Sequence, residues 1–140
     1  AILLVTDGQD NASRYSFDEV KRMLKESDAT VYAVWIANPE GDSALGYGGR
    51  LELQELAKLS GGRALFPSTV QELNSAMEVV ADELRNQYVI GFAPAPAGKK
   101  DGWHEVRVRL GEVRDGSGRK LKTVLRTRAG FYDAPPARGN

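Results

Sequence analysis

The chain has 140 residues, of which 41% are hydrophobic and 27% are charged, a composition typical of one soluble globular domain with its own core. It contains no cysteine, which excludes disulfides, thiolate metal sites and cysteine nucleophiles, and no apolar run approaches the roughly 20 residues that span a bilayer, so we expect no membrane insertion. The formal net charge is zero, which argues against strong non-specific attraction to nucleic acid or anionic lipid.

Four apolar runs within residues 1–93 have the length and composition of strands. They are Ile2–Val5, Thr30–Ile36, Arg63–Phe66 and Tyr88–Phe92. The first run is continuously apolar, which is typical of a strand that is buried on both faces within a parallel sheet. Since the sequence opens on this run, without an initiator Met or a basic secretory signal, we expect the strand to be cut from a larger fold.

Amphipathic stretches lie between these runs and predict helices. Ser16 and Glu19 have the spacing of a capping box, in which each side chain satisfies a backbone N–H at the start of a helix. A Gly-rich loop is predicted over Asn38–Gly49, followed by a helix that ends at Gly61–Gly62, where a residue free to take φ > 0 is favoured. A third helix, capped by Ser68 or Thr69, is predicted to bury the stripe Val70, Leu73, Met77, Val80 and Leu84.

This alternation predicts the α/β class, with a doubly wound, mainly parallel sheet covered by helices on both faces and formed by residues 1–93. After a Pro-rich linker, apolar and polar residues alternate from Trp103 onward. A second strand-like stretch, Leu121–Arg128, follows the Gly-rich turn Asp115–Gly118. Two-residue periodicity around such a turn predicts an antiparallel β-hairpin. We therefore assign residues 94–133 to a β-hairpin extension of the same domain and residues 134–140 to a disordered tail.

Several motifs occur in the order that they have in one known family. Ile2–Gly8 is an apolar strand that ends in Thr-Asp-Gly, and Thr30–Val34, Leu56–Arg63 and Glu83–Tyr88 follow it. Together they resemble the C-terminal part of a von Willebrand factor A-type (vWA) domain. The later segments Tyr88–Phe92 and Arg128–Tyr132 look like a bacterial subgroup, the vWA-related proteins abundant in Acidobacteria.

The resemblance implies a metal-ion-dependent adhesion site at the carboxyl ends of the strands, where Mg²⁺ or a similar divalent cation bridges the domain to a carboxylate of a protein ligand. Of the three elements that build such a site, only the Asp after the fourth strand has a counterpart here, Asp7. Thr6, Asp10 and Asn11 are candidates to support it. The other elements would lie upstream of Ala1, so we expect a metal in the intact domain and little or none on this chain alone.

The implied function is a protein-binding module, not an enzyme, in an extracytoplasmic (periplasmic or secreted) protein. The position of Asp7 agrees independently, because open α/β sheets bind ligands beyond the carboxyl ends of their strands. A single carboxylate holds Mg²⁺ only weakly. The alternative for Asp7 is a turn residue of an Asp-Gly pair. Asp10, Asn11 and Ser13 are equally well explained as loop residues that satisfy their own backbone.

Three further features have a plain structural explanation. His104 is the sole histidine, and without a second one we expect a partly exposed strand residue, not a zinc or Ser-His-Asp site. Gly46–Gly49 lacks the Gly-Lys-Ser/Thr ending of a phosphate-binding loop. The basic stripe lacks interleaved aromatic residues, which favours a solvated hairpin face over a nucleic-acid site; it comprises Arg107, Arg109, Lys122, Arg126 and Arg128.

Two other functions stay open as alternatives: a Mg²⁺-dependent hydrolase or phosphoryl-transfer domain that uses Asp7 and Asp10, and a nucleic-acid-binding module that uses the basic hairpin. A third expectation concerns self-association. In vWA folds another strand lies beside the counterpart of Ile2–Val5, so this run is expected to form an uncovered apolar edge here. Uncovered edges recruit other strands, which predicts a homodimer through Ile2–Val5.

Overall fold

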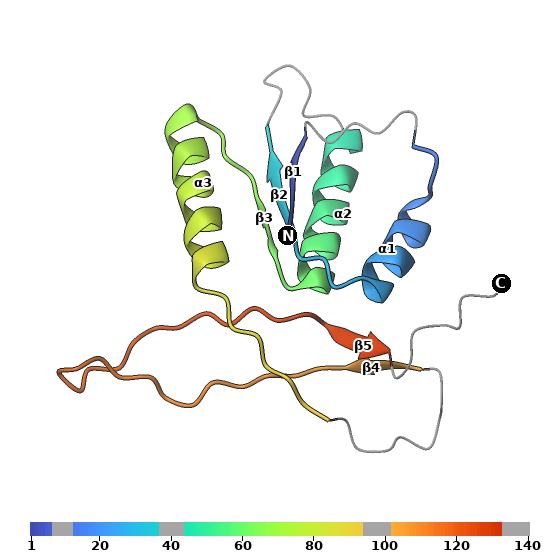
Figure 1. Ribbon diagram of the computed structural model, residues 1–140. Coiled ribbons are helices and arrows are strands. Elements are labelled where there is room, and N and C mark those ends of the chain that lie inside the picture. Colours follow the sequence, from blue (N-terminus) through green and yellow to red (C-terminus); the bar gives the residue numbers. More distant parts are fainter. Residues whose placement is uncertain (7–12, 37–43, 94–101, 133–140) are drawn as a thin grey trace.

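The computed structural model describes residues 1–6, 13–36, 44–93 and 102–132. These residues form a mixed α/β fold with a three-stranded parallel sheet, three helices and a separate two-stranded antiparallel pair (Figure 1). The predicted α/β character is confirmed, although a three-stranded sheet is not a complete doubly wound fold. In chain order the elements are β1 (Ile2–Thr6), α1 (Phe17–Glu26), β2 (Val31–Trp35), α2 (Ala44–Ser60), β3 (Arg63–Leu65), α3 (Val70–Arg85), β4 (Trp103–Glu105) and β5 (Gly130–Tyr132).

The central strand of the parallel sheet is β2, which pairs with β1 on one side and β3 on the other. All five residues of β2 are buried, as expected for a strand that is covered on both faces. Ala33 and Trp35 pack against Leu53 of α2, whereas the hydroxyl of Tyr32 accepts a hydrogen bond from Gln87, just beyond α3. Because alternate residues of a strand point to opposite faces, α2 and α3 cover opposite faces of the sheet (Figure 1).

Local sequence signals fix the helix ends. Ser16 caps α1 in the predicted capping box: its N–H donates to Glu19 Oε2 over 2.8 Å, and its Oγ accepts from the Glu19 N–H. The Ser16 N–H and hydroxyl together lower the pKa of the Glu19 carboxyl. Thr69, one of the two predicted residues, caps α3 through a hydrogen bond from the Glu72 N–H.

The predicted end of α2 at Gly61–Gly62 is confirmed in detail. The Gly61 N–H donates to Lys58 O and the Gly62 N–H to Ala57 O, which is the hydrogen-bond pattern of a Schellman motif. Gly61 has φ of +82°, the left-handed conformation that this motif requires. The Oγ of the buried Ser60 accepts from the Val31 N–H over 2.9 Å, so the end of α2 also anchors the start of β2.

Two predicted segments differ from the structure. The loop predicted over Asn38–Gly49 is wrong for its second half, because α2 already begins at Ala44; residues 37–43 lie outside the described part. The strand predicted at Tyr88–Phe92 is also wrong: these residues pair with no strand in the described structure, and Tyr88 and Val89 are 91% and 99% exposed. An apolar run forms a strand only where a neighbouring strand offers an unpaired edge, and the sequence of the run does not show whether such an edge exists.

Burial also differs from the prediction in two elements. The prediction that Ile2–Val5 is buried on both faces is wrong, because β1 is an edge strand whose four apolar side chains are 37% to 53% exposed. In α3, Val80 is buried as predicted, but Ala76 takes the second buried position. The prediction of burial is wrong for Val70, Met77 and Leu84, which are exposed. A short sheet leaves part of the amphipathic helix without a partner surface.

The β-hairpin is confirmed at its two ends. β4 and β5 pair antiparallel where the arms meet, and the predicted turn is closed by Asp115 and Arg119, whose backbones hydrogen-bond over 2.9 Å. Gly118 in this turn has φ of +83°. Hydrogen bonds from the Ser117 hydroxyl and from the Arg119 and Ser117 N–H groups lower the pKa of the Asp115 carboxyl. The continuous strands predicted for the arms are wrong, because regular strand is confined to three residues on each side.

The pairing register changes along the hairpin. The Val106 N–H donates to Ala129 O near the base, and the Leu121 N–H donates to Val113 O near the turn. Six residues (107–112) lie between these points on the outgoing arm but seven (122–128) on the returning arm. The returning arm therefore carries one extra residue between these two points, where no regular strand pairing is present.

Replacement of Gly61 by alanine is expected to destabilise the fold by roughly 2 kcal/mol or more, because the residue has a left-handed φ and its new Cβ would lie 2.6 Å from the backbone of Thr127 and Arg128. Urea unfolding monitored by circular dichroism measures the change. Gly116→Ala is the matched control, since nothing lies within 4 Å of its Cβ position. Equal stability of the two variants would contradict the close packing at Gly61.

Candidate functional site

The carboxyl ends of β1 and β2 lie together at one edge of the sheet. Thr6 and Trp35 are register partners, and the Ile36 N–H donates to Thr6 O over 2.8 Å, so the two strands end level with each other. Thr6 is half-buried at the last position of β1. The predicted metal ligand Asp7 follows it directly in sequence; Asp7, Asp10 and Asn11 lie outside the described residues.

The described residues near this edge do not by themselves form a metal centre. Within residues 1–6, 13–36, 44–93 and 102–132, no three His, Cys, Asp or Glu side chains are grouped so that they could hold a metal ion. Ser13, one of the polar residues considered near Asp7, is exposed. The chemistry predicted for this edge therefore depends on the segments that follow β1 and β2.

A second polar arrangement lies at the opposite end of the strands, where the returning arm of the hairpin crosses the α/β unit. The Ala129 N–H donates to Leu59 O over 3.1 Å, which joins the arm to the last turn of α2. Arg128 donates to the Asp28 carboxylate over 2.6 Å and to Lys25 O over 2.9 Å. The second bond satisfies a carbonyl at the C-terminus of α1, where a cation is favourable.

Arg126 joins the same arm to α3 through a shared carboxylate. Glu83 Oε1 accepts from Arg126 over 2.7 Å and from Arg63 of β3 over 3.0 Å. The three side chains are 22% to 35% exposed, so the pairs are partly shielded from water. Two cations around one carboxylate leave this cluster with a net positive charge.

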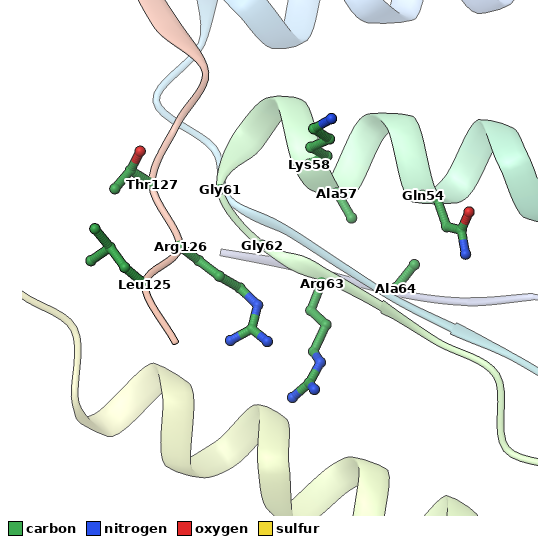
Figure 2. A pocket seen from close by; sticks show the side chains of 10 residues that line it. All are labelled: Gln54, Ala57, Lys58, Gly61, Gly62, Arg63, Ala64, Leu125, Arg126 and Thr127. Carbon is green, nitrogen blue, oxygen red and sulfur yellow. The ribbon is translucent and has the colours of Figure 1, made fainter. Parts of the chain in front are cut away.

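A groove of about 400 Å³ lies beside this cluster (Figure 2). Arg63 and Arg126 extend from β3 and from the hairpin arm toward α3, whereas Gln54 and Lys58 project from α2. The floor is built from small residues. The lining comprises Gln54, Ala57, Lys58, Gly61, Gly62, Arg63, Ala64, Leu125, Arg126 and Thr127, among which three are cationic and none is acidic.

His104 occupies an aromatic cluster at the base of the hairpin. It stacks on Phe131 with ring centroids 5.3 Å apart, and Phe92 meets the same ring edge-on at 5.3 Å. Trp103 packs edge-on against Tyr132, and the Lys25 ammonium lies 5.0 Å from the Trp103 ring. The half-buried strand position expected for His104 is confirmed, and its described surroundings are those of a packing residue.

The basic stripe is largely paired with carboxylates. Arg107 contacts Glu105 over 3.3 Å, Arg126 contacts Glu83, and Arg128 contacts Asp28. These pairings reduce the positive potential that the sequence pattern alone indicates, which weakens the case for the hairpin as a nucleic-acid surface.

Sequence reasoning missed the cluster around Glu83. Its partners Arg63 and Arg126 lie 20 and 43 residues away, so no local spacing relates them. The sequence pattern places Arg126 only in the basic stripe. The alternation of residues in the hairpin arm places Arg126 on a charged face. Its contact with Glu83 arises because the arm lies near α3 in the folded chain, which the local sequence does not reveal.

Comparison with protein-family models, with curated proteins and with solved structures gives no match. Within the described residues, no helix has the length and apolar character required to cross a membrane.

Glu83→Gln is expected to lower the free energy of unfolding by roughly 1–3 kcal/mol, because it removes the charged acceptor that two arginines share in a partly shielded site. Asp82→Asn is the matched control on the next residue. Its pair with Arg85 is about 75% exposed, so a change within about 0.5 kcal/mol is expected. Urea unfolding measures the change in the free energy of unfolding for the two variants. An equally small change in both would contradict a structural role for Glu83.

Proposed function

We propose that this chain is part of a vWA-type binding module that contacts a protein ligand at the carboxyl edge of a doubly wound parallel sheet. The observation that supports the proposal is the level ending of β1 and β2, with Thr6 opposite Trp35 and the Thr-Asp-Gly motif continuing from the end of β1. Loops at this edge of open α/β sheets are the usual place for ligands. The module belongs to an extracytoplasmic protein.

Asp7 is the residue that connects this edge to a cation. In the complete domain its carboxylate helps to hold Mg²⁺ or a similar divalent ion, directly or through a water, and Thr6, Asp10 and Asn11 support it. A bound ion would offer a coordination position to a carboxylate of the protein ligand. The mechanism is reversible ligation, in which no covalent bond of the ligand is made or broken.

The alternative function at the same edge is Mg²⁺-dependent hydrolysis or phosphoryl transfer with Asp7 and Asp10. Such chemistry requires a positioned nucleophile or water and a base in addition to the metal. Binding requires only exposed oxygen ligands and a complementary surface. The binding hypothesis therefore requires fewer functional groups among the residues that follow β1, and we prefer it for this reason.

Mn²⁺ titration followed by electron paramagnetic resonance tests the role of Asp7. Residues 1–140 are expected to bind the ion weakly, with a Kd of roughly 1 mM, because one carboxylate is a small part of a full ligand set. Asp7→Asn is expected to abolish this binding, whereas Asp18→Asn, an exposed residue of α1, leaves it unchanged. Binding that survives Asp7→Asn would contradict the assignment, and Mg²⁺-dependent phosphoester turnover lost in Asp7→Asn would favour the hydrolase.

A homodimer through β1 is the partner interaction that the described residues favour. Four apolar side chains of this edge strand are 37% to 53% exposed, and Ile2–Thr6 contains no charge, proline or glycine that would protect the edge. Antiparallel pairing of two copies of β1 would join their sheets. A five-residue strand buries much less than the roughly 1,600 Å² of a standard interface, so the dimer is expected to be weak.

Light scattering across a concentration series is expected to detect a rise toward the dimer mass that Val5→Lys removes, because a charge on an apolar edge opposes strand pairing. Val124→Lys on the hairpin, where the wild-type side chain is 68% exposed, is the control and should dimerise like the unmodified chain. A monomer at every concentration, or equal loss in both variants, would contradict pairing through β1.

A further inference from the structure

The outer edge of β3 is bordered by the groove that Figure 2 shows. β3 pairs with β2 on one side only, and no other strand of the described residues lies on its second side. Gly62, Arg63 and Ala64, at the start of β3, line the groove, and Leu125–Thr127 of the hairpin arm form its opposite wall. The backbone groups on this side of β3 therefore face a channel instead of another strand.

The shape of the groove suits an extended chain. Ala64, which follows Arg63 in β3, contributes only a methyl group to the lining, so another backbone is able to approach β3 there. The space beside Gly61 and Gly62 is already filled by residues 127–128 and by the Val31 carbonyl. Addition of a peptide strand to an open sheet edge is a recurrent mode of recognition, in which backbone hydrogen bonds supply affinity and flanking side chains supply specificity.

The charge of the groove selects for acidic side chains. Lys58, Arg63 and Arg126 contribute three positive charges to the lining, and Glu83, the carboxylate that both arginines bind, accepts a single hydrogen bond from each of them. A guanidinium has five N–H donors in a planar fork that matches a carboxylate. The arginines thus retain donors after binding Glu83, and the local net charge stays positive.

We propose that this groove binds an extended acidic peptide segment of a partner protein by strand addition to β3. The partner's backbone pairs with the edge of β3, and its carboxylates lie against Arg63, Arg126 and Lys58. This surface is separate from the edge that carries Asp7, because it lies at the amino-terminal end of β3, whereas Asp7 follows the carboxyl end of β1. The inference therefore goes beyond the proposed cation-dependent site and does not rest on it.

Fluorescence anisotropy with a labelled short peptide of consecutive glutamates, whose carboxylates reach both faces of an added strand, in Mg²⁺-free buffer containing a chelator, tests the inference. Saturable binding to residues 1–140 is expected, and Lys58→Glu is expected to weaken it roughly tenfold through like-charge repulsion at the rim. Lys58 is exposed, so the variant is expected to fold. The matched control is Lys122→Glu, an equal charge change on the exposed hairpin arm outside the groove, with an expected change below roughly twofold.

Two further probes separate strand addition from general charge attraction. Replacement of the glutamates by glutamine is expected to abolish binding, and N-methylation of alternate backbone amides of the peptide is expected to weaken it strongly, since it removes the donors that would pair with β3. Amide shifts in the NMR spectrum should centre on Arg63–Leu65. No saturable binding, equal effects of the two lysine variants, an unchanged affinity of the N-methylated peptide, or preferred binding of free phosphate would each overturn the proposal.

Discussion

Three backbone segments approach one another at Gly61 and Gly62, and the remainder of the described structure depends on this contact. A Cβ on Gly62 would meet the carbonyl of Val31, and one on Gly61 would lie 2.6 Å from the backbone at residues 127 and 128. The same dipeptide follows the last residue of α2, precedes β3 and leaves room for the hairpin arm. Glycine is required at both positions, because Gly61 has a left-handed φ and Gly62 lies in direct contact with a backbone carbonyl.

This packing explains why the polar cluster lies where it does. Once β3 starts at the Gly pair, its register with β2 sets Arg63 opposite Tyr32, on the face that α3 covers. Passage of the hairpin arm beside Gly61 brings Arg126 to the same face. The arrangement of Arg63, Glu83 and Arg126 is therefore a consequence of backbone geometry, and the groove is the space left between β3 and the arm that crosses it.

The parts of the fold that the sequence predicts correctly are those determined by neighbouring residues. The capping box at Ser16, the Schellman motif at Gly61–Gly62 and the turn at Asp115 each need only a few adjacent residues, and all three form. The burial of a side chain depends on every element that packs around the sheet and not on neighbouring residues alone. The hydrophobic pattern therefore predicts burial wrongly for Tyr88–Phe92 and for the two faces of β1. For the predicted site, the structure describes Thr6 and the strand ends but not Asp7. The Glu83 cluster, whose partners lie 20 and 43 residues away, and the groove beside it have no sequence signature.

The two outer edges of the parallel sheet differ in chemistry, and this difference separates their interactions. β1 presents uncharged apolar side chains. A two-fold axis would place the same apolar side chains of two copies in contact, so this edge suits pairing with an identical strand. β3 presents Arg63 with Arg126 beside it, so a second copy of this edge would bring like charges together and be repelled. An acidic chain meets no such repulsion. A ligand that takes the remaining donors of Arg126 would leave its hydrogen bond to Glu83 in place, so an occupied groove is compatible with the contact that holds the hairpin arm to α3.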